Sequence, residues 1–193
     1  MTQGFKSEFE TIEILVNSNA KTGRTDAFTI AFTKLEKQAR RTFTYLIYQY
    51  PAFRLSHYKE ILAIIASKRF LDFDNFIKGF DTIYPKSFET IIGSPLYTSF
   101  IKTDFPRIKN FRNKILHGQP TGENLSSDEL KAEIDILKNW CSCVAESMMT
   151  EIYYDGLEWN SFRKCTTIDL SSIYTVNISD INELDTFIET NMR

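Results

Sequence analysis

The chain contains only two histidines, His57 and His117, among its 193 residues. Histidine is the side chain whose ordinary pKa lets it take up or release a proton near neutral pH. Any acid–base mechanism that uses histidine in this protein must therefore use one of these two residues. His57 follows Ser56 at the start of a predicted helix, so we expect it to be an exposed or capping residue.

His117 ends the run FRNKILH, residues 111–117, at the C-terminal end of another predicted helix. Asn113 and His117 are four residues apart and share a helical face, where the amide could orient the imidazole or bind a substrate oxygen. Arg112 lies about 100° around an ideal helix from Asn113 and about 140° from His117. One helix would not aim both Arg112 and His117 at a single atom. Two such helices meeting across a two-fold axis would bring two copies of all three residues into one cleft.

The chain's net charge of -2 hides a basic segment. Residues 102–114 contain five bases and one acid, a net charge of +4, whereas residues 166–193 contain five acids and one base. Clustered Lys and Arg attract phosphates, so RNA or DNA is a plausible partner. The bases of this segment that we expect to bind RNA, besides Arg112, are Lys102, Arg107, Lys109 and Lys114.

A second group of bases lies on the helix predicted over residues 25–50. We expect it to form a solvated helix face, which could extend an RNA track. Glu36 interrupts the group, and it either pairs with Arg40 at i+4 or takes a direct part in catalysis. The other bases of the group are Lys34, Lys37 and Arg41.

Histidine, arginine and asparagine together suit the cleavage of RNA. The 2′-OH of RNA can attack the neighbouring phosphodiester, so the protein has only to move protons and stabilise a charged transition state. Imidazole can move those protons, and guanidinium offers a planar fork of donors to phosphate oxygens. This chemistry requires no metal, and we expect neither a metal nor a cofactor.

Apolar residues recur at helical spacing along most of the chain and predict an all-α protein. With only 7 glycines and 5 prolines, the sequence favours long helices over many short strands. We expect the helix over residues 57–69 to be central, because apolar residues cover much of its surface. The other expected long helices cover residues 5–16, 25–50 and 126–154, with two short ones between residues 72 and 92.

The helix that carries FRNKILH starts near Pro95 or Pro106 and stops at Gly118, since glycine tolerates a left-handed cap. Ser126 and Glu129 form a capping box that starts the next helix. In the tail, residues 174–178 alternate as in a strand, and a last short helix follows. The expected organisation is an N-terminal helix and loop (1–23), a helical bundle (24–155) and a C-terminal extension packed on it (156–193).

Several function classes are disfavoured. The longest apolar run, Ile61 to Ala66, has six residues, and a membrane span needs about 20. The N-terminal residues lack the pattern of a secretory signal, so we expect a cytoplasmic protein. The three cysteines, at positions 141, 143 and 165, fit neither a disulfide framework nor zinc spacing, and we expect them to be packing residues.

Arg112, Asn113 and His117 resemble the R-x4-H motif of the HEPN superfamily, in which a polar residue follows the arginine. The resemblance spans residues 24–155: a long first helix, a motif that closes a later helix, and a long final helix. It implies a bundle of about five main helices, found in prokaryotic toxins, phage-defence proteins and CRISPR-associated RNases. It also implies a homodimeric, metal-independent endoribonuclease with catalytic Arg112 and His117 and accessory Asn113, leaving a 2′,3′-cyclic phosphate and a 5′-OH.

One toxin subgroup extends the motif to R-x4-H-x-Y, whose tyrosine is modified by a partner nucleotidyltransferase. Here the corresponding residue is Gln119, so a cognate antitoxin or regulator would act by another route. An alternative function is a catalytically silent HEPN-like module that dimerises or binds RNA to regulate a partner. A structural alternative is that Lys114 and His117 only stabilise the C-terminus of their helix.

Overall fold

The computed structural model describes residues 1–118 and 126–193, so Gln119 lies outside the described part of the chain. The described residues are mostly helical and form no β-strand, which confirms the expected all-α class. The α-helices are α1 (Gln3–Val16), α2 (Gly23–Gln49), α3 (Tyr58–Ser67), α4 (Phe73–Ile83), α5 (Phe88–Ile92), α6 (Ser94–Ser99), α7 (Phe105–Leu116), α8 (Ser127–Ile152) and α9 (Ile181–Asn191). Short 3-10 turns cover Leu55–His57 and Leu170–Ile173, and a π-helical turn covers Phe100–Asp104.

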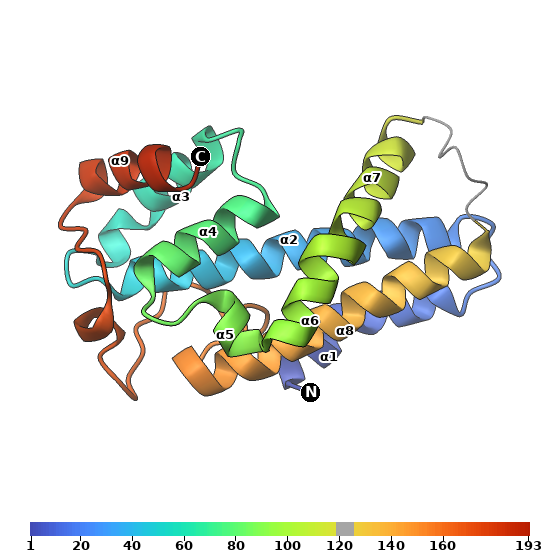
Figure 1. Ribbon diagram of the computed structural model, residues 1–193, viewed down its shortest axis with the longest axis horizontal. Coiled ribbons are helices and arrows are strands. Elements are labelled where there is room, and N and C mark those ends of the chain that lie inside the picture. Colours follow the sequence, from blue (N-terminus) through green and yellow to red (C-terminus); the bar gives the residue numbers. More distant parts are fainter. Residues whose placement is uncertain (119–125) are drawn as a thin grey trace.

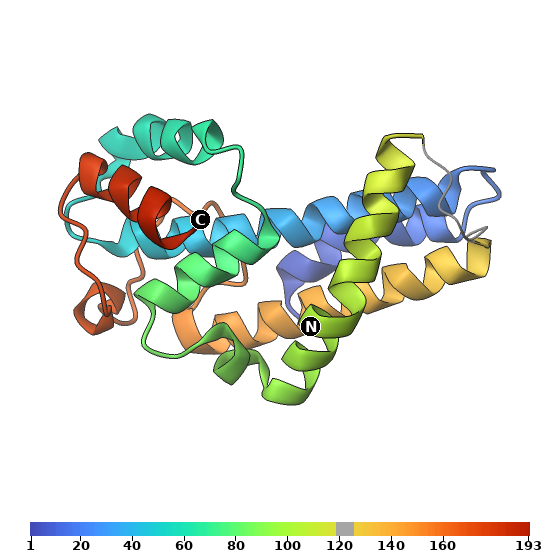
Figure 2. The ribbon, with the colours of Figure 1, turned by 45° about the horizontal axis from the view of Figure 1, so that its top comes forward.

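Helix α2 runs along most of the length of the molecule, and α8 lies beside it in the same direction (Figure 1). Helix α1 packs against both and runs antiparallel to α2. Helices α4 and α7 also pack on α2. The C-terminal end of α7 lies at the opposite end of the molecule from α3 and α9 (Figure 2). Helix α2 is therefore the element on which α1, α4, α7 and α8 assemble.

The apolar stripe of α2 explains this central position. Phe28, Leu35 and Phe43 are all buried, as the periodicity predicts, and the last turns from Thr42 to Gln49 are buried on every side. Buried apolar residues from α1 through to Met192, just after α9, belong to one core cluster. The division into segments 1–23, 24–155 and 156–193 stays a prediction.

The expectation that the helix over residues 57–69 is central was wrong. This segment forms a 3-10 turn and α3, and α3 buries only Ile61 and Ile65. Leu62 on the same helix is 38% exposed, and Ile64 is half-buried. Helix α3 lies at the edge of the molecule, where its helical neighbours are the adjoining 3-10 turn and α9.

Both prolines in front of the FRNKILH helix mark a helix start. Pro95 lies in the first turn of α6 and Pro106 in the first turn of α7, with the π-helical turn Phe100–Asp104 between them. The ambiguity in the sequence therefore reflects a real succession of three helical segments. Gly118 follows α7 with φ 61°, which confirms the left-handed cap.

Local signals also predict the start of α8. Ser126 Oγ accepts a hydrogen bond from the backbone N–H of Glu129 at 3.2 Å, and the Glu129 carboxylate accepts from the Ser126 N–H at 2.6 Å. This is the expected capping box. The last short helix is confirmed as α9, which Asp180 caps at its N-terminus.

The predicted C-terminal strand was wrong. Residues 174–178 do alternate between more buried and more exposed positions. Their backbone contacts are isolated, however: the Thr175 N–H donates to the Ile83 carbonyl at 2.9 Å, and Val176 O accepts from the Tyr50 hydroxyl. Without a partner strand, an alternating segment lies on the core as an extended chain and forms no ladder.

Two glycines with positive φ provide a test of the packing between α2 and the tail. At Gly156, with φ 76°, an added Cβ would lie 2.7 Å from Thr42 Oγ1 and 3.0 Å from the Gln38 carbonyl. At Gly118, with φ 61°, no described atom would lie within 4 Å. We expect Gly118→Ala to cost about 1 kcal/mol through backbone strain and Gly156→Ala about 3 kcal/mol, because overpacking adds to the strain. Urea denaturation measures both, and equal costs would contradict the close contact.

Candidate functional site

Helix α7 carries the FRNKILH run and is fixed by its apolar face. Phe105, Ile108 and Phe111 are buried, and the Phe105 ring stacks on Phe32 of α2 with centroids 6.1 Å apart. This packing leaves the opposite side of α7 for its polar side chains. The Arg112 guanidinium lies 5.3 Å from the centre of the Phe32 ring, a distance typical of a cation–π contact.

Two polar neighbours hold the guanidinium of Arg112. Its Nη1 donates to Asn113 Oδ1 at 3.0 Å, and its Nη2 lies 3.9 Å from a carboxylate oxygen of Glu36 on α2. Asn113 therefore orients the arginine through its amide oxygen, whereas the sequence had suggested the imidazole or a substrate. The carboxylate of Glu36 is paired with Arg112 from another helix instead of with Arg40, its neighbour at i+4.

His117 is the C-cap residue of α7. Its backbone N–H donates to the Asn113 carbonyl at 3.1 Å, and its side chain is exposed. On a helix with a rise of about 1.5 Å per residue, Arg112 and His117 are about 7.5 Å apart along the axis. The structure thus brings Arg112 and Asn113 into contact and presents His117 at the end of the same helix.

Most of the positive charge of residues 102–114 is matched by acids from other elements. Arg107 donates through two nitrogens to both carboxylate oxygens of Glu133 on α8, at 2.9 and 3.0 Å. Lys109 donates to Asp72 at 2.8 Å and lies 3.4 Å from Asp74. These contacts give Arg107 and Lys109 structural roles in joining α7 to α8 and to the start of α4.

The other two bases of this segment lie at its two ends. Lys102 is exposed on the π-helical turn, and Lys114 is half-buried in the last turn of α7. The structure therefore does not gather the four predicted RNA-binding residues into one patch. It distributes them along the length of the segment, with the central two in ion pairs.

The acids that pair with α7 were not found from the sequence. Glu133 is only 7% exposed. A signal was present, because Glu133 lies three residues after Leu130 and four before Leu137, on the apolar face of α8. An acid on a buried helical face needs a cationic partner. The sequence does not say that Arg107 is that partner.

Burial raises the pKa of Glu36 above its ordinary value. The Arg112 guanidinium partly opposes this effect, and the Asp72 carboxylate adds to it. The pKa of Glu8 on α1 is shifted in the opposite direction. Burial alone would raise its pKa, but hydrogen bonds from Lys34 and Lys37 outweigh that effect and hold the pKa below its ordinary value.

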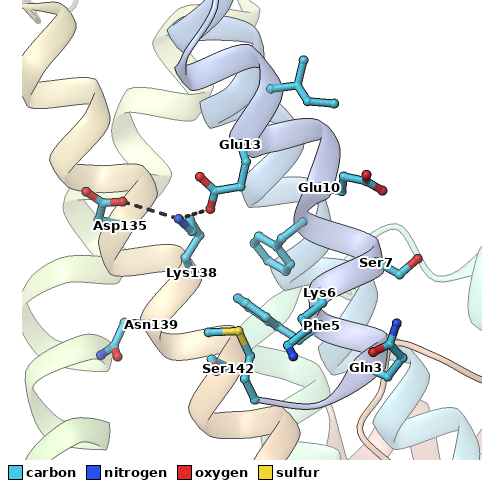
Figure 3. A pocket seen from close by; sticks show the side chains of 13 residues that line it. Gln3, Phe5, Lys6, Ser7, Glu10, Glu13, Asp135, Lys138, Asn139 and Ser142 are labelled. Atoms are coloured by element: carbon cyan, nitrogen blue, oxygen red, sulfur yellow. Dashed lines mark ion pairs between the residues drawn. The ribbon is translucent and has the colours of Figure 1, made fainter.

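A cavity of about 800 Å³ lies between α1 and α8, and charged side chains of both signs line it. Figure 3 shows Lys138 pointing between Glu13 and Asp135, its two ion-pair partners. Glu10 and Lys6 also line this cavity, so its acids outnumber its lysines. A phosphate would find little attraction there, and we do not assign the cavity to RNA.

The second histidine has a structural role. His57 Nδ1 accepts a hydrogen bond from the backbone N–H of Arg54 at 3.1 Å, which confirms the expected capping role. Cys141 is fully buried in the core, as expected of a packing thiol. His117 is thus the histidine whose side chain is exposed for chemistry.

No family model, curated protein or solved structure matches this chain. Among the described residues, no helix is both long enough and apolar enough to span a membrane. The function must therefore be argued from the geometry of the site and from the motif.

The opposite pKa shifts of Glu36 and Glu8 lead to a stability test. Glu36, with its raised pKa, makes the fold less stable as pH rises through the interval above 4.5, whereas Glu8, with its lowered pKa, contributes stability that is lost on acidification. We expect Glu36→Gln to leave the melting temperature at pH 7 unchanged or higher, and Glu8→Gln to lower it. Both differences should shrink at pH 4. Thermal melts of both variants at the two pH values check this, and an equal loss at pH 7 would contradict it.

Proposed function

We propose that this protein is a metal-independent endoribonuclease of HEPN type that acts as a homodimer in the cytoplasm, in a toxin or phage-defence setting. The observation that carries the proposal is the Arg112 guanidinium, held by Asn113 at 3.0 Å, on the same helix end as the exposed His117. The resemblance of these residues to the R-x4-H motif supports the same reaction. A cognate antitoxin or other regulator would control such an activity.

The proposed cleavage needs no reactant other than the RNA itself. The 2′-oxygen of a ribose attacks the adjacent phosphorus, a 2′-O–P bond forms and the P–O5′ bond breaks. One imidazole removes the proton of the 2′-OH, and a second imidazole protonates the leaving 5′-oxygen. The products are a 2′,3′-cyclic phosphate and a 5′-OH. Arg112 stabilises the negative charge that develops on the phosphate oxygens.

Two imidazoles require two copies of the chain, because His57 caps a distant turn. A two-fold axis near the end of α7 would supply His117 from both subunits. Leu116, next to His117, is 51% exposed and offers an apolar contact to a second copy at this position. The composite site would also overcome the wide angle between Arg112 and His117 on one helix.

A catalytically silent module that dimerises or binds RNA to regulate a partner is the second candidate. The carboxylate of Glu36 near Arg112 favours it, because this charge competes with a phosphate for the guanidinium. The two candidates differ in whether purified protein cleaves RNA that it binds.

Cleavage is tested with a single-stranded RNA in the presence of EDTA. We expect products that end in a 2′,3′-cyclic phosphate, and a rate at least about 100-fold lower in His117→Ala and Arg112→Ala, because each removes a group that acts in the transition state. His57→Asn is the matched histidine control and should retain the wild-type rate, since asparagine can still accept the capping hydrogen bond. Undiminished cleavage by both alanine variants would disprove the assignment. Binding without cleavage by the wild-type protein would favour the silent module.

The dimer is tested by light scattering after size exclusion. We expect a mass of twice the 22.5 kDa of one chain. Leu116→Gln should shift the protein toward the monomer, because it places a polar group in the expected contact. Ile14→Gln is the control, because Ile14 is 64% exposed on α1, far in sequence from the end of α7. A strictly monomeric wild-type protein would exclude the composite site.

A further inference from the structure

A groove of about 750 Å³ lies between α2, α3 and residues 160–162, separate from the polar end of α7. Five bases line it, from α2 and from the end of α3, against two acids. Some of these bases belong to the second basic group, which the sequence analysis identified on the helix predicted over residues 25–50. The bases are Lys37, Arg40, Arg41, Lys68 and Arg69.

The two lysines of the groove are matched by acids. Lys37 donates to Glu8 at 2.6 Å, and Lys68 lies 2.7 Å from both Asp185 and Glu189. Lys37 shares the Glu8 carboxylate with Lys34, whereas Lys68 has two acidic partners; these ion pairs offset part of the lysine charge and hold the ammonium groups in place. The positive charge that remains to attract a ligand comes from the arginines.

Arg41 is bound to neutral groups. Its guanidinium donates to the backbone carbonyls of Leu157 and Trp159, which fastens the chain after α8 to α2. These carbonyls fix the side chain but leave its positive charge unbalanced. Arg41 is thus both a structural tie and a fixed charge in the wall of the groove.

Two further arginines line this groove, Arg40 from α2 and Arg69 from the residue that follows the C-cap of α3. Both are exposed, and within residues 1–118 and 126–193 neither makes a hydrogen bond or an ion pair through its side chain. Guanidinium groups bind phosphate oxygens in pairs, through parallel N–H donors. Together with Arg41 they give the groove three arginines that form no close ion pair with an acid of the described residues, although the Arg40 charge also acts on Glu36.

An aromatic pair lines the same groove. Tyr58 and Phe162 are half-buried and meet edge to face, with ring centroids 4.5 Å apart. A basic track beside partly exposed aromatic rings is typical of a surface that binds single-stranded nucleic acid, because phosphates contact Lys and Arg side chains and a nucleobase stacks on a ring.

The groove also adjoins the candidate catalytic residues. Its two acids, Glu36 and Asp72, are the ones that lie next to Arg112 and Lys109 of α7. A strand in the groove would therefore lead toward Arg112. This continuity favours RNA over an acidic protein segment, which would have no reason to approach the motif.

We propose that this groove binds the backbone of single-stranded RNA, with phosphates on Arg40 and Arg69 and a base against Tyr58. The inference rests on the proposed function for its choice of RNA, but the binding does not depend on cleavage. A strand bound in the groove would therefore run toward Arg112 of α7.

The test measures the affinity for a fluorescent 2′-O-methyl dodecaribonucleotide, which has no free 2′-OH and cannot be cleaved by the proposed reaction. The groove variant is Arg40→Gln/Arg69→Gln. Loss of two phosphate contacts should weaken binding about 20-fold at 0.1 M salt and reduce the slope of log K against log salt by about 1.4. Lys6→Gln/Lys21→Gln also removes two exposed charges, outside the groove, and should bind as the wild-type protein does.

Equal affinities of the groove variant and the lysine control would overturn the proposal, as would the failure of the wild-type protein to bind the oligonucleotide. Binding of poly-glutamate as tight as that of the oligonucleotide would show that the groove takes acidic chains in general, which also overturns it. A duplex of the same sequence should bind less tightly than the single strand, and tighter duplex binding contradicts the assignment. Groove-dependent binding by a protein that cleaves no RNA would support the groove and disprove only the nuclease.

Discussion

The burial of α2 is the constraint on which the rest of the molecule depends. Its apolar stripe faces α1, α8, α4 and α7, so every one of these helices takes its position from the same surface. Polar ties reinforce the packing. The buried Gln38 amide donates to the carbonyls of Cys141 on α8 and Asp155 after it, both at 3.0 Å. Because α7 is seated by Phe105 on Phe32, the position of Arg112 also follows from α2.

The same packing determines which basic side chains can still attract a phosphate. A segment with a net charge of +4 in sequence loses much of its attraction for phosphate once Arg107 meets Glu133 and Lys109 meets Asp72. The unmatched arginines instead include Arg40 and Arg69, which lie in a groove that no single segment of the chain forms. Linear charge density therefore does not show which basic side chains the folded protein leaves without an acidic partner.

Sequence patterns predicted the structure correctly where they depend on interactions between residues close together in the sequence. Helical stripes and the capping box of Ser126 and Glu129 depend on neighbours within about four residues, and both were confirmed. The central position expected for α3 and the strand expected over residues 174–178 depended on partners elsewhere in the chain, and both were wrong. The pairs of Arg107 with Glu133 and of Lys109 with Asp72 were missed for the same reason, since they join residues 26 and 37 positions apart. The motif itself was visible because its residues lie within one helix end.

The relation between Glu36 and Arg112 determines how the motif could meet a phosphate. At 3.9 Å the two groups form an ion pair without a hydrogen bond, and such a half-exposed pair contributes little to stability. Since burial already raises the pKa of Glu36, an approaching phosphate would disfavour its ionised form further and loosen the pair. Asn113 would keep the guanidinium in place through its separate bond to Nη1. Under the proposed function, Glu36 would release the guanidinium as a phosphate binds, and Asn113 would hold it in position.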